Sequence, residues 1–361
     1  MVKAAVMRAV GAPLEIEDVA IAKPGPHEVL IRTHATDVCH SDLHFLKGHY
    51  PTKLPTVLGH ESAGVVEQVG SEVRTVKPGD HVVTCLSAFC GHCEYCVTGH
   101  LSLCEEPDVA RGKGEAPRIA KGDENVAQFL NLSAFAEQML IHENACVAIR
   151  PDMPLDRAAL IGCAVVTGYG SVVHTAKVRP GETVAVIGCG GIGLSTINAA
   201  ALAGAGRVIA VDRVAAKESM ARAFGATDFV DASDGDTVKK IRDMTNGGVD
   251  HALEAIGLPA TAEDAFKMLR RAGTATIIGM IPVGQKVTLN GYEFLQEKVM
   301  RGSNMGSNVF PVDIPRLVDF YMQGKLKLDE LISRRIGLSD IDSAFEEMET
   351  GAIARSVITF D

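Results

Sequence analysis

Alternation of apolar and helix-forming segments between residues 183 and 280 constrains the fold of this chain most. Short runs rich in Val, Ile and Ala are separated by longer segments with helical spacing of their apolar residues. The apolar runs are 183–188, 207–212, 228–232, 249–257 and 274–280, and the segments between them are 194–206, 213–226, 237–247 and 260–273. Buried strands that alternate with helices are typical of a parallel sheet covered on both faces. We therefore predict an α/β domain with a doubly wound parallel sheet.

A glycine cluster follows the first of these apolar runs and opens the first helical segment. It matches G-x-G-x-x-G, and its glycines are Gly188, Gly190, Gly191 and Gly193. In this position between strand and helix, glycines permit a tight turn and a close approach of the backbone to a pyrophosphate. The free N–H groups of the following helix would bind the phosphates. The motif predicts a dinucleotide site.

Asp212 ends the second apolar run, nineteen residues beyond the last glycine of the motif. A carboxylate there accepts hydrogen bonds from the adenosine ribose and repels a 2′-phosphate, so NAD is favoured over NADP. Arg213 weakens that preference slightly. A flavin or another adenine nucleotide stays open as an alternative ligand at this point.

The two ends of the chain differ from this middle part. Residues 1–150 contain short β-type runs separated by Gly and Pro turns, for example 27–36 and 62–70. Beyond residue 300 the alternation stops, and we expect helices near 314–325 and 338–351 and a closing strand at 354–360. We predict a nucleotide domain, residues 165–300, inserted into a β-rich domain made of 1–164 and 301–361.

Four of the nine cysteines lie within fifteen residues, with spacing C-x2-C-x2-C-x7-C. They are Cys90, Cys93, Cys96 and Cys104. Four thiolates can close a tetrahedral shell around zinc and leave no open position, which predicts a structural site holding the lobe 90–104. An iron–sulfur cluster is the alternative, but the ferredoxin spacing ends C-x3-C-P, unlike this one. Unliganded buried cysteines are the remaining alternative.

A second, dispersed set of potential ligands is weaker as a pattern. Cys39 begins the segment CHSDLH, His60 and Glu61 follow about twenty residues later, and Cys163 precedes the nucleotide domain. Three ligands of the Cys₂His type would leave one coordination position open, as a catalytic zinc requires. These residues are therefore candidates for a second zinc site.

Composition excludes several classes of function. The formal net charge is −10, which disfavours a nucleic-acid partner. Apolar stretches are interrupted within about ten residues, too short for the roughly twenty of a membrane span. The odd number of cysteines and the lack of an apolar leader segment argue against a disulfide framework. We expect a cytoplasmic protein without a membrane or nucleic-acid partner.

Several further motifs occur in one order along the chain. They are CHSDLH (39–44), GHESAGVVEQVG (59–70), KPGDHVV (77–83), CGHCEYC (90–96), GCAVVTGYGSV (162–172), GCGGIG (188–193) and GAIARSVITF (351–360). With these motifs the chain resembles the zinc-dependent medium-chain alcohol dehydrogenases over essentially its whole length. The resemblance implies a GroES-like β-barrel catalytic domain with an inserted Rossmann domain, and two zinc ions per chain together with NAD.

The resemblance also implies roles for individual residues. Those at the catalytic zinc are Cys39, His60 and Cys163 as ligands, Glu61 as a nearby acid, and Asp42 as the carboxylate that orients the ligating histidine. Ser41 and His44 match the proton relay. Those at the cofactor are His40, Thr167, Asp212, Lys217 and Arg355. Leu86 and Phe129 match the substrate pocket.

The implied reaction is reversible hydride transfer between a primary alcohol and NAD, which gives the aldehyde. Leu86 and Phe129 favour medium-chain, aryl or allylic alcohols. A secondary alcohol or a thiol–formaldehyde adduct is the alternative substrate, and a non-catalytic zinc- and nucleotide-binding module is a remote one. The segment 46–53 carries no acidic residue, unlike that of family members that oxidise a glutathione adduct. The long segment 105–134 after the four-cysteine lobe resembles that of the dimeric branch of the family, which implies a homodimer, with a tetramer as the alternative.

Overall fold

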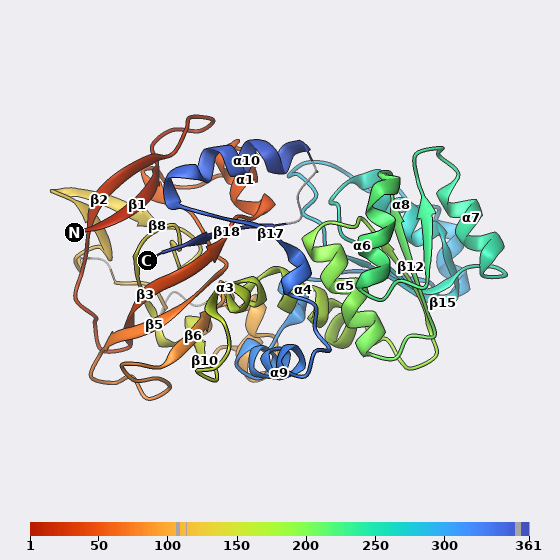
Figure 1. Ribbon diagram of the computed structural model, residues 1–361. Coiled ribbons are helices and arrows are strands. Elements are labelled where there is room, and N and C mark those ends of the chain that lie inside the picture. The colour runs from red at the N-terminus through yellow and green to blue at the C-terminus, as the bar shows by residue number, and fades with distance from the viewer. Residues whose placement is uncertain (106–108, 113, 351–354, 361) are drawn as a thin grey trace. The chain divides into compact units, whose positions relative to one another are not determined.

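The computed structural model describes residues 1–105, 109–112, 114–350 and 355–360. The chain divides into two compact units. The first unit comprises 1–163 and 309–361, and the second comprises 164–308 (Figure 1). The second boundary lies beyond the predicted residue 300 because strand β16 (Val299–Gly302) still pairs with the sheet of the second unit.

The first unit is built from a small closed barrel and a seven-stranded sheet. The barrel strands are, in spatial order, β1 (Val2–Met7), β2 (Glu15–Ile21), β7 (Ile119–Lys121), β8 (Glu124–Gln128) and β4 (Thr56–Val57). The sheet order is β10 (Cys146–Ala148), β6 (His81–Thr84), β5 (Ser62–Val69), β3 (Glu28–Asp37), β18 (Arg355–Thr359) and β17 (Ile332–Ile336). Strand β9 (Gln138–His142) also pairs with β3.

Strand β3 organises this unit because it is the longest strand and is buried along most of its length. It pairs antiparallel with β5 and with β18, so the C-terminal end of the chain is tied to the N-terminal part. The helices of the unit are α1 (His40–Leu46), α2 (Glu94–Val97), α3 (Leu155–Ala158), α9 (Phe310–Met322) and α10 (Ile341–Thr350). Because α1 follows β3 after two residues, the end of this strand fixes the start of the helix.

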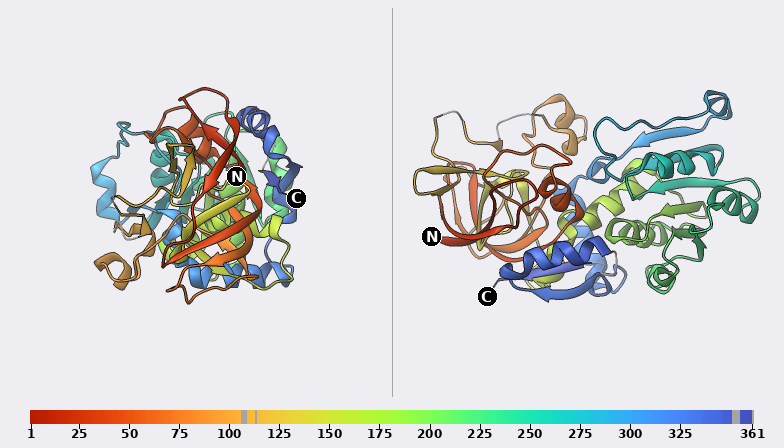
Figure 2. Two further views of the ribbon diagram at one scale, coloured as in Figure 1. Left: turned by 90° about the vertical axis from the view of Figure 1, so that its left-hand side faces the viewer. Right: turned by 90° about the horizontal axis from the view of Figure 1, so that it is seen from above.

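The second unit is a six-stranded parallel sheet. Its order is β13 (Asp228–Asp231), β12 (Arg207–Asp212), β11 (Thr183–Ile187), β14 (Val249–Glu254), β15 (Leu269–Ile277) and β16. Helices α4 (Ala164–Gly170), α5 (Gly191–Leu202), α6 (Glu218–Ala223), α7 (Thr237–Met244) and α8 (Pro259–Lys267) accompany it, and helices lie on both of its faces (Figure 2). This arrangement confirms the predicted α/β class and doubly wound sheet.

One predicted element has the wrong limit. The segment 260–273 has helical spacing, but α8 ends at Lys267 and β15 begins at Leu269. Leu269 pairs with Val249, and the register then shifts before Thr274 pairs with His251; Ala272, whose φ is +59°, lies in this stretch. The pairing of a neighbouring strand thus overrides the local helical pattern, which a single sequence does not reveal.

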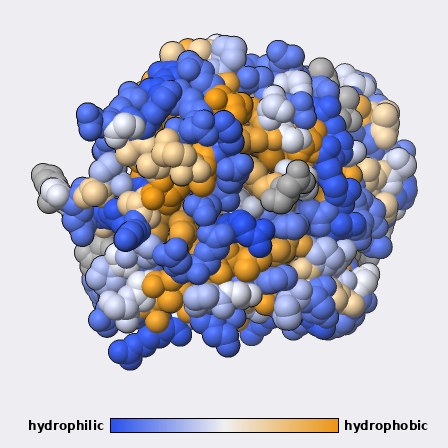
Figure 3. All heavy atoms as spheres, turned by 60° about the vertical axis from the view of Figure 1, so that its left-hand side comes forward, coloured by the Kyte–Doolittle hydropathy of each residue, from blue (hydrophilic) through white to orange (hydrophobic). Residues whose placement is uncertain are grey.

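Polar residues dominate the face drawn in Figure 3, where apolar residues show between them. Exposed apolar area between polar residues is ordinary on a protein surface. Within the described ranges, no single helix is long and apolar enough to cross a membrane; one bent pair of helices, Leu155–Gly162 with Ala164–Ala176, passes that test by length and composition alone.

Candidate active site and zinc centres

Four potential metal ligands from three distant segments meet inside the first unit. The ligand atoms of Cys39, His60, Glu61 and Cys163 all lie within 4.8 Å of one another, and all four residues are buried. Cys39 precedes α1, the His–Glu pair precedes β5, and Cys163 follows a short 3-10 helix. Gly162 permits this approach, because a Cβ there would lie 2.3 Å from the carbonyl oxygen of Thr84. The predicted ligand set is therefore brought together.

The orientation of His60 fits a metal ligand. Its Nδ1 lies 3.0 Å from Oδ1 of Asp42, while its Nε2 is buried without a hydrogen-bond partner. A carboxylate that accepts a hydrogen bond from Nδ1 keeps the ring hydrogen on that atom, so the lone pair of Nε2 is available to a metal, as in other histidine–metal sites. A buried nitrogen left without a partner is costly unless something binds it. One such nitrogen beside two sulfurs is a donor set that suits zinc.

Asp42 fixes more than the histidine. Its Oδ1 also accepts from the Gly59 N–H at 3.1 Å, and its Oδ2 accepts from the Cys39 N–H at 3.3 Å. The side chain is fully buried, so water does not compete for these oxygens. One carboxylate thus holds the backbone N–H of Cys39, the N–H of the residue before His60, and the ring of His60. Asp42 thus lies where the predicted orienting role requires it, and the role itself stays a prediction.

The two cysteines of this group are electrostatically distinct. A hydrogen bond with Cys163 is the main cause that lowers the pKa of the Cys39 thiol well below its usual value, against the effect of burial. The neighbouring His60 lowers it further. The thiolate is the form that binds metals, so this direction of the shift is consistent with the ligand role predicted for Cys39.

Arg355, which the resemblance assigns to the cofactor phosphates, is buried against this group. Its Nη1 donates to Asp37 at 2.7 Å and to Glu61 at 3.0 Å. The guanidinium compensates two buried carboxylates that would otherwise be costly in the interior. Arg355 and Glu61 are therefore held together at the metal group, and the phosphate contact of Arg355 stays a prediction.

Sequence reasoning missed Asp37 in this cluster. It is the last residue of β3 and lies fully buried, two positions before Cys39. Burial raises its pKa to about 7, although Arg355 opposes this. A charged residue at the end of an otherwise buried strand was the available signal in the sequence.

Helix α1 carries the residues matched to the relay. Ser41 and His44 are both partly buried, and His40, matched to a cofactor phosphate, is exposed at the start of the helix. Burial, and then the neighbouring His49, lower the pKa of His44 below its usual value. His49 was left without a role by the sequence, yet its ring lies against that of His44. The spacing of five residues across a helix end gave no signal for this contact.

The two residues matched to the substrate pocket lie in different surroundings. Phe129 is buried, and its ring centroid lies 6.2 Å from that of His60 in an edge-on arrangement. The ring of Phe45 packs against that of Phe129 with 4.9 Å between the centroids, and the ring centroid of Tyr50 lies 5.6 Å from that of Phe45. Leu86 is half-buried and packs against a core cluster next to the seven-stranded sheet. An aromatic wall thus adjoins one candidate zinc ligand.

The four-cysteine lobe has the geometry of a closed metal site. The Sγ atoms of Cys90, Cys93, Cys96 and Cys104 lie within 4.8 Å of one another, and none of the nine cysteines, all of which lie in the described ranges, forms a disulfide. The backbone N–H groups of His92 and Cys93 donate to the sulfur of Cys90. Despite some desolvation, these bonds lower the pKa of that thiol to about 7. Four sulfurs with N–H donors fit a structural zinc.

The glycines of the G-x-G-x-x-G motif serve different structural purposes. Gly188 has φ +96°, and a Cβ at Gly193 would lie 1.7 Å from the carbonyl oxygen of Gly188. These two positions therefore serve the turn and the packing of α5 onto β11. A Cβ at Gly190 would meet no atom within 4 Å, so the space beside the start of α5 is open at this position. Gly191 is the first residue of that helix.

Asp212 holds the glycine loop as well as lying at the end of β12. Its Oδ2 accepts from the Cys189 N–H at 2.8 Å and lies 3.2 Å from Nζ of Lys217, while its Oδ1 accepts from the Val214 N–H. The structure thus brings the two predicted ribose contacts together. Thr167, matched to the nicotinamide, is buried in α4, where its Oγ1 lies 3.6 Å from the sulfur of Met305.

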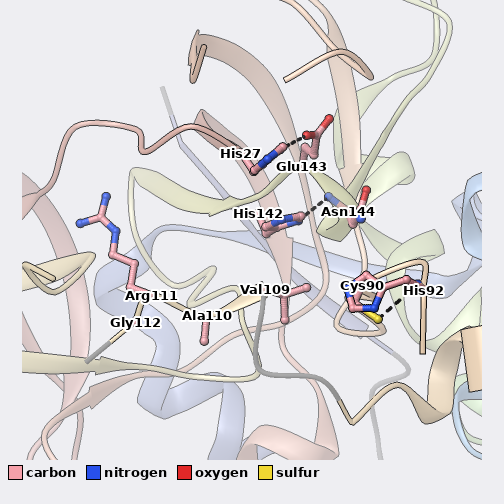
Figure 4. Close-up of a pocket in the computed structure, with 10 residues that line it drawn as sticks. All are labelled: His27, Cys90, His92, Val109, Ala110, Arg111, Gly112, His142, Glu143 and Asn144. Carbon is pink, nitrogen blue, oxygen red and sulfur yellow. Dashed lines mark hydrogen bonds and ion pairs between the residues drawn. The ribbon is translucent and has the colours of Figure 1, made fainter. Parts of the chain in front are cut away.

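A separate hollow of about 860 Å³ lies beside the cysteine lobe in the first unit (Figure 4). Its lining includes His27, His142 and Glu143, with Nδ1 of His27 2.9 Å from a carboxylate oxygen of Glu143. In Figure 4 the guanidinium of Arg111 points away from the two histidines. None of the residues around Cys39 lines this hollow, so we assign no part of the chemistry to it.

Comparison with known proteins agrees with this geometry. Residues 25–151 match the family model described as alcohol dehydrogenase GroES-like domain, and residues 191–322 match zinc-binding dehydrogenase. The S-(hydroxymethyl)glutathione dehydrogenase of Saccharomyces cerevisiae is 39% identical, over 97% of this chain and 94% of its own length.

Two solved structures are similar over the whole chain. An alcohol dehydrogenase zinc-binding domain protein from Burkholderia ambifaria has a TM-score of 0.95 and 36% identity, covering 100% of this chain and 99% of its own. Benzyl alcohol dehydrogenase from Acinetobacter calcoaceticus has a TM-score of 0.94 and 32% identity, with the same coverage. Together with the two candidate zinc sites and the glycine loop, these matches show that the chain belongs to the zinc-dependent alcohol dehydrogenases of the medium-chain superfamily, NAD-dependent oxidoreductases that act on CH–OH groups.

Proposed function

We propose that this enzyme oxidises primary alcohols that carry an apolar or aryl group to the aldehyde, and catalyses the reverse reduction. The observation that supports this substrate class is the aromatic wall of Phe129, Phe45 and Tyr50 beside His60. Aromatic rings bury large apolar areas and prefer edge-on or offset contacts with other rings. A substrate with an apolar group next to its hydroxyl carbon would be favoured there over a strongly charged one.

We propose that Cys39, His60 and Cys163 bind the catalytic zinc and that Cys90, Cys93, Cys96 and Cys104 bind the structural one. When bound, the catalytic zinc would supply a Lewis acid for the alcohol oxygen, and NAD would supply the hydride acceptor. Asp42 keeps the hydrogen of His60 on Nδ1, so the ring can ligate through Nε2. Glu61 is held by Arg355 next to the ligands.

Residues of α1 would remove the proton of the substrate hydroxyl. Ser41 would accept it and pass one of its own toward His44. A serine is a poor base by itself, so a group that titrates near neutral pH has to receive the proton. Because the pKa of His44 is lowered, its imidazole stays neutral, and able to accept a proton, at pH values at which an ordinary histidine begins to be protonated.

A second candidate substrate is a thiol–formaldehyde adduct, and the names of the curated relatives favour it. The Saccharomyces cerevisiae relative is an S-(hydroxymethyl)glutathione dehydrogenase, and the Myxine glutinosa relative, 37% identical, is an alcohol dehydrogenase class-3. Identity at this level supports the shared chemistry more strongly than the shared substrate, because substrate choice depends on a few pocket side chains.

A substrate panel separates the two candidates. We expect kcat/KM to be highest for benzyl and medium-chain primary alcohols with NAD, lower for secondary alcohols, and lowest for S-hydroxymethylglutathione. Phe129→Ala should lower kcat/KM for benzyl alcohol by about tenfold, the value of one lost aromatic contact. Phe89→Ala is a matched control in the same unit, because Phe89 packs on Phe310 and not on this wall. A preference for S-hydroxymethylglutathione would support the second candidate instead.

We further propose that the enzyme is a homodimer. The edge strand β16 supports this, since its residue Val299 is exposed and the nearby Tyr292 and Leu295 are 71% and 78% exposed. An open strand edge with apolar neighbours is suited to pairing with another chain. Sedimentation analysis should give twice the chain mass of 38.2 kDa, whereas four times that mass would indicate a tetramer.

A further inference from the structure

The turn after helix α1 brings a second histidine against His44. Helix α1 ends at Leu46, and Gly48 has φ +73°, a conformation that favours glycine and reverses the chain. The N–H of His49 then donates to the carbonyl oxygen of His44 at 2.9 Å. The geometry of the helix end therefore fixes the position of the second imidazole.

The two rings contact each other through equivalent nitrogens. Nδ1 of His44 lies 3.1 Å from Nδ1 of His49, and the ring centroids are 5.4 Å apart. A hydrogen bond needs one donor and one acceptor, and a neutral imidazole carries a single N–H. The pair therefore shares one hydrogen between the two Nδ1 atoms, and the Nε2 atoms are left for other partners.

Exposure differs between the two rings. His44 is half-buried, whereas His49 is exposed. A path from His44 to His49 thus leads from the inside of the unit to water within two imidazoles.

We propose that His49 is the proton-exit residue of this enzyme: it takes the proton that reaches His44 and releases it to solvent. This inference rests on the proposed function, in which His44 receives the proton of the substrate hydroxyl.

The transfer conserves protons at each step. A proton arrives at Nε2 of His44, whose Nδ1–H is donated to Nδ1 of His49. The Nδ1 hydrogen moves to His49, which becomes an imidazolium, and His44 is again neutral. His49 then loses its Nε2 proton to water. In the reverse direction, aldehyde reduction, the same path brings a proton in and restores the starting tautomers.

Charged groups around the pair favour this direction. Lys47, at the end of α1, is paired with Glu349 of helix α10. Burial first, and then His49 and Lys47, lower the pKa of His44, while Cys39 opposes them. Burial and these charges therefore disfavour a positive charge on His44, and repulsion disfavours a state in which both rings are imidazolium ions.

The test combines proton release with histidine NMR in the zinc-loaded enzyme. A pH indicator would follow proton release in single turnovers with NAD and benzyl alcohol. His49→Gln should slow this release by roughly tenfold, less than the roughly 10²–10⁴-fold that a positioned acid or base contributes. Added imidazole buffer should restore the rate. His100→Gln, which removes another exposed histidine, should release protons at the wild-type rate.

The NMR titration measures the pKa of His44 in the absence of turnover. His49→Gln should raise the pKa of His44, because one of the groups that lowers it is gone. In a His44→Gln background, His49→Gln should cause no further slowing, because His49 acts through His44.

Three results would overturn the inference. A wild-type release rate in His49→Gln, with slow release in His44→Gln, would refute the exit role and leave the relay intact. Additional slowing in the double variant would show that His49 acts elsewhere. A wild-type rate in His44→Gln would refute the relay itself, and the proposed proton path with it.

Discussion

Asp42→Asn tests the role of the carboxylate that organises the candidate zinc group. The substitution keeps the size of the side chain and replaces one acceptor oxygen by an NH₂ group. In the native structure two carboxylate oxygens accept from three donors: the ring of His60 and the N–H groups of Gly59 and Cys39. Since the site is fully buried, no water replaces a lost acceptor.

Each orientation of the amide has a cost. With its NH₂ toward His60, the ring must carry its hydrogen on Nε2 and cannot ligate through that atom. With its NH₂ toward the backbone of Cys39, two donors face each other, which costs about 1–3 kcal/mol for an unsatisfied buried group. Loss of such an orienting partner typically reduces metal affinity by about 10–100-fold, or roughly 1.4–2.7 kcal/mol.

The assay is a zinc competition titration against a chelator. We expect Asp42→Asn to bind one of its two zinc ions about 10–100-fold more weakly than the wild type, so that a weaker chelator removes this ion. The affinity for the second zinc ion should stay as in the wild type. Asp152→Asn is the control, because Asp152 is exposed and pairs only with Arg150 among the contacts described. If Asp42→Asn retained both ions with wild-type affinity, the reasoning about tautomer and donor count would be refuted.

Further predictions concern the cofactor loop and stability. A Cβ at Gly190 would meet no protein atom within 4 Å, so we expect Gly190→Ala to keep the melting temperature and to bind NAD more weakly. In Gly193→Ala the new Cβ collides with the carbonyl oxygen of Gly188, which should lower both the melting temperature and the affinity for NAD. Calorimetry and NAD titration check this pair, and equal behaviour of the two variants would contradict the prediction. Asp212→Gly removes a negative charge and a support of the glycine loop, so NADP should gain on NAD by roughly tenfold in kcat/KM, and an unchanged cofactor ratio would mean that another group sets the choice. Glu28 is buried, which raises its pKa, but hydrogen bonds from Arg111, the Gly25 N–H and Arg118 outweigh this and hold the pKa at about 2, below its usual 4.5. Its contribution is therefore complete above pH 4.5 and is lost as the pH falls toward 2, and Glu28→Gln should cost about 1–3 kcal/mol of unfolding free energy at pH 7, with little difference from the wild type near pH 2.

The alternation of strands and helices and the glycine motif were sufficient to predict the second unit. Helices between the buried runs indicate a parallel sheet, but the strand order was not predicted: β13 lies at one edge, whereas β14, the next strand in the chain, pairs with β11. The sequence also predicted the four-cysteine group, since its ligands lie in one short loop.

Contacts between distant segments were the part that patterns did not reveal. Asp37 meets Arg355 across 318 positions, and the sequence resemblance alone gave the arginine a different partner. His49 meets His44 through a backbone reversal at Gly48, which depends on one positive φ. Such pairs arise from the fold as a whole, so a single sequence has no periodicity that marks them.

Zinc content and turnover of Cys163→Ala, measured on the same preparation, test the central assignment most directly. Wild-type protein should contain two zinc ions per chain and form NADH from benzyl alcohol. Cys163→Ala should retain one zinc, in the four-cysteine lobe, and form no NADH. Two zinc ions with normal NADH formation in this variant would contradict the placement of the catalytic metal at Cys39, His60 and Cys163.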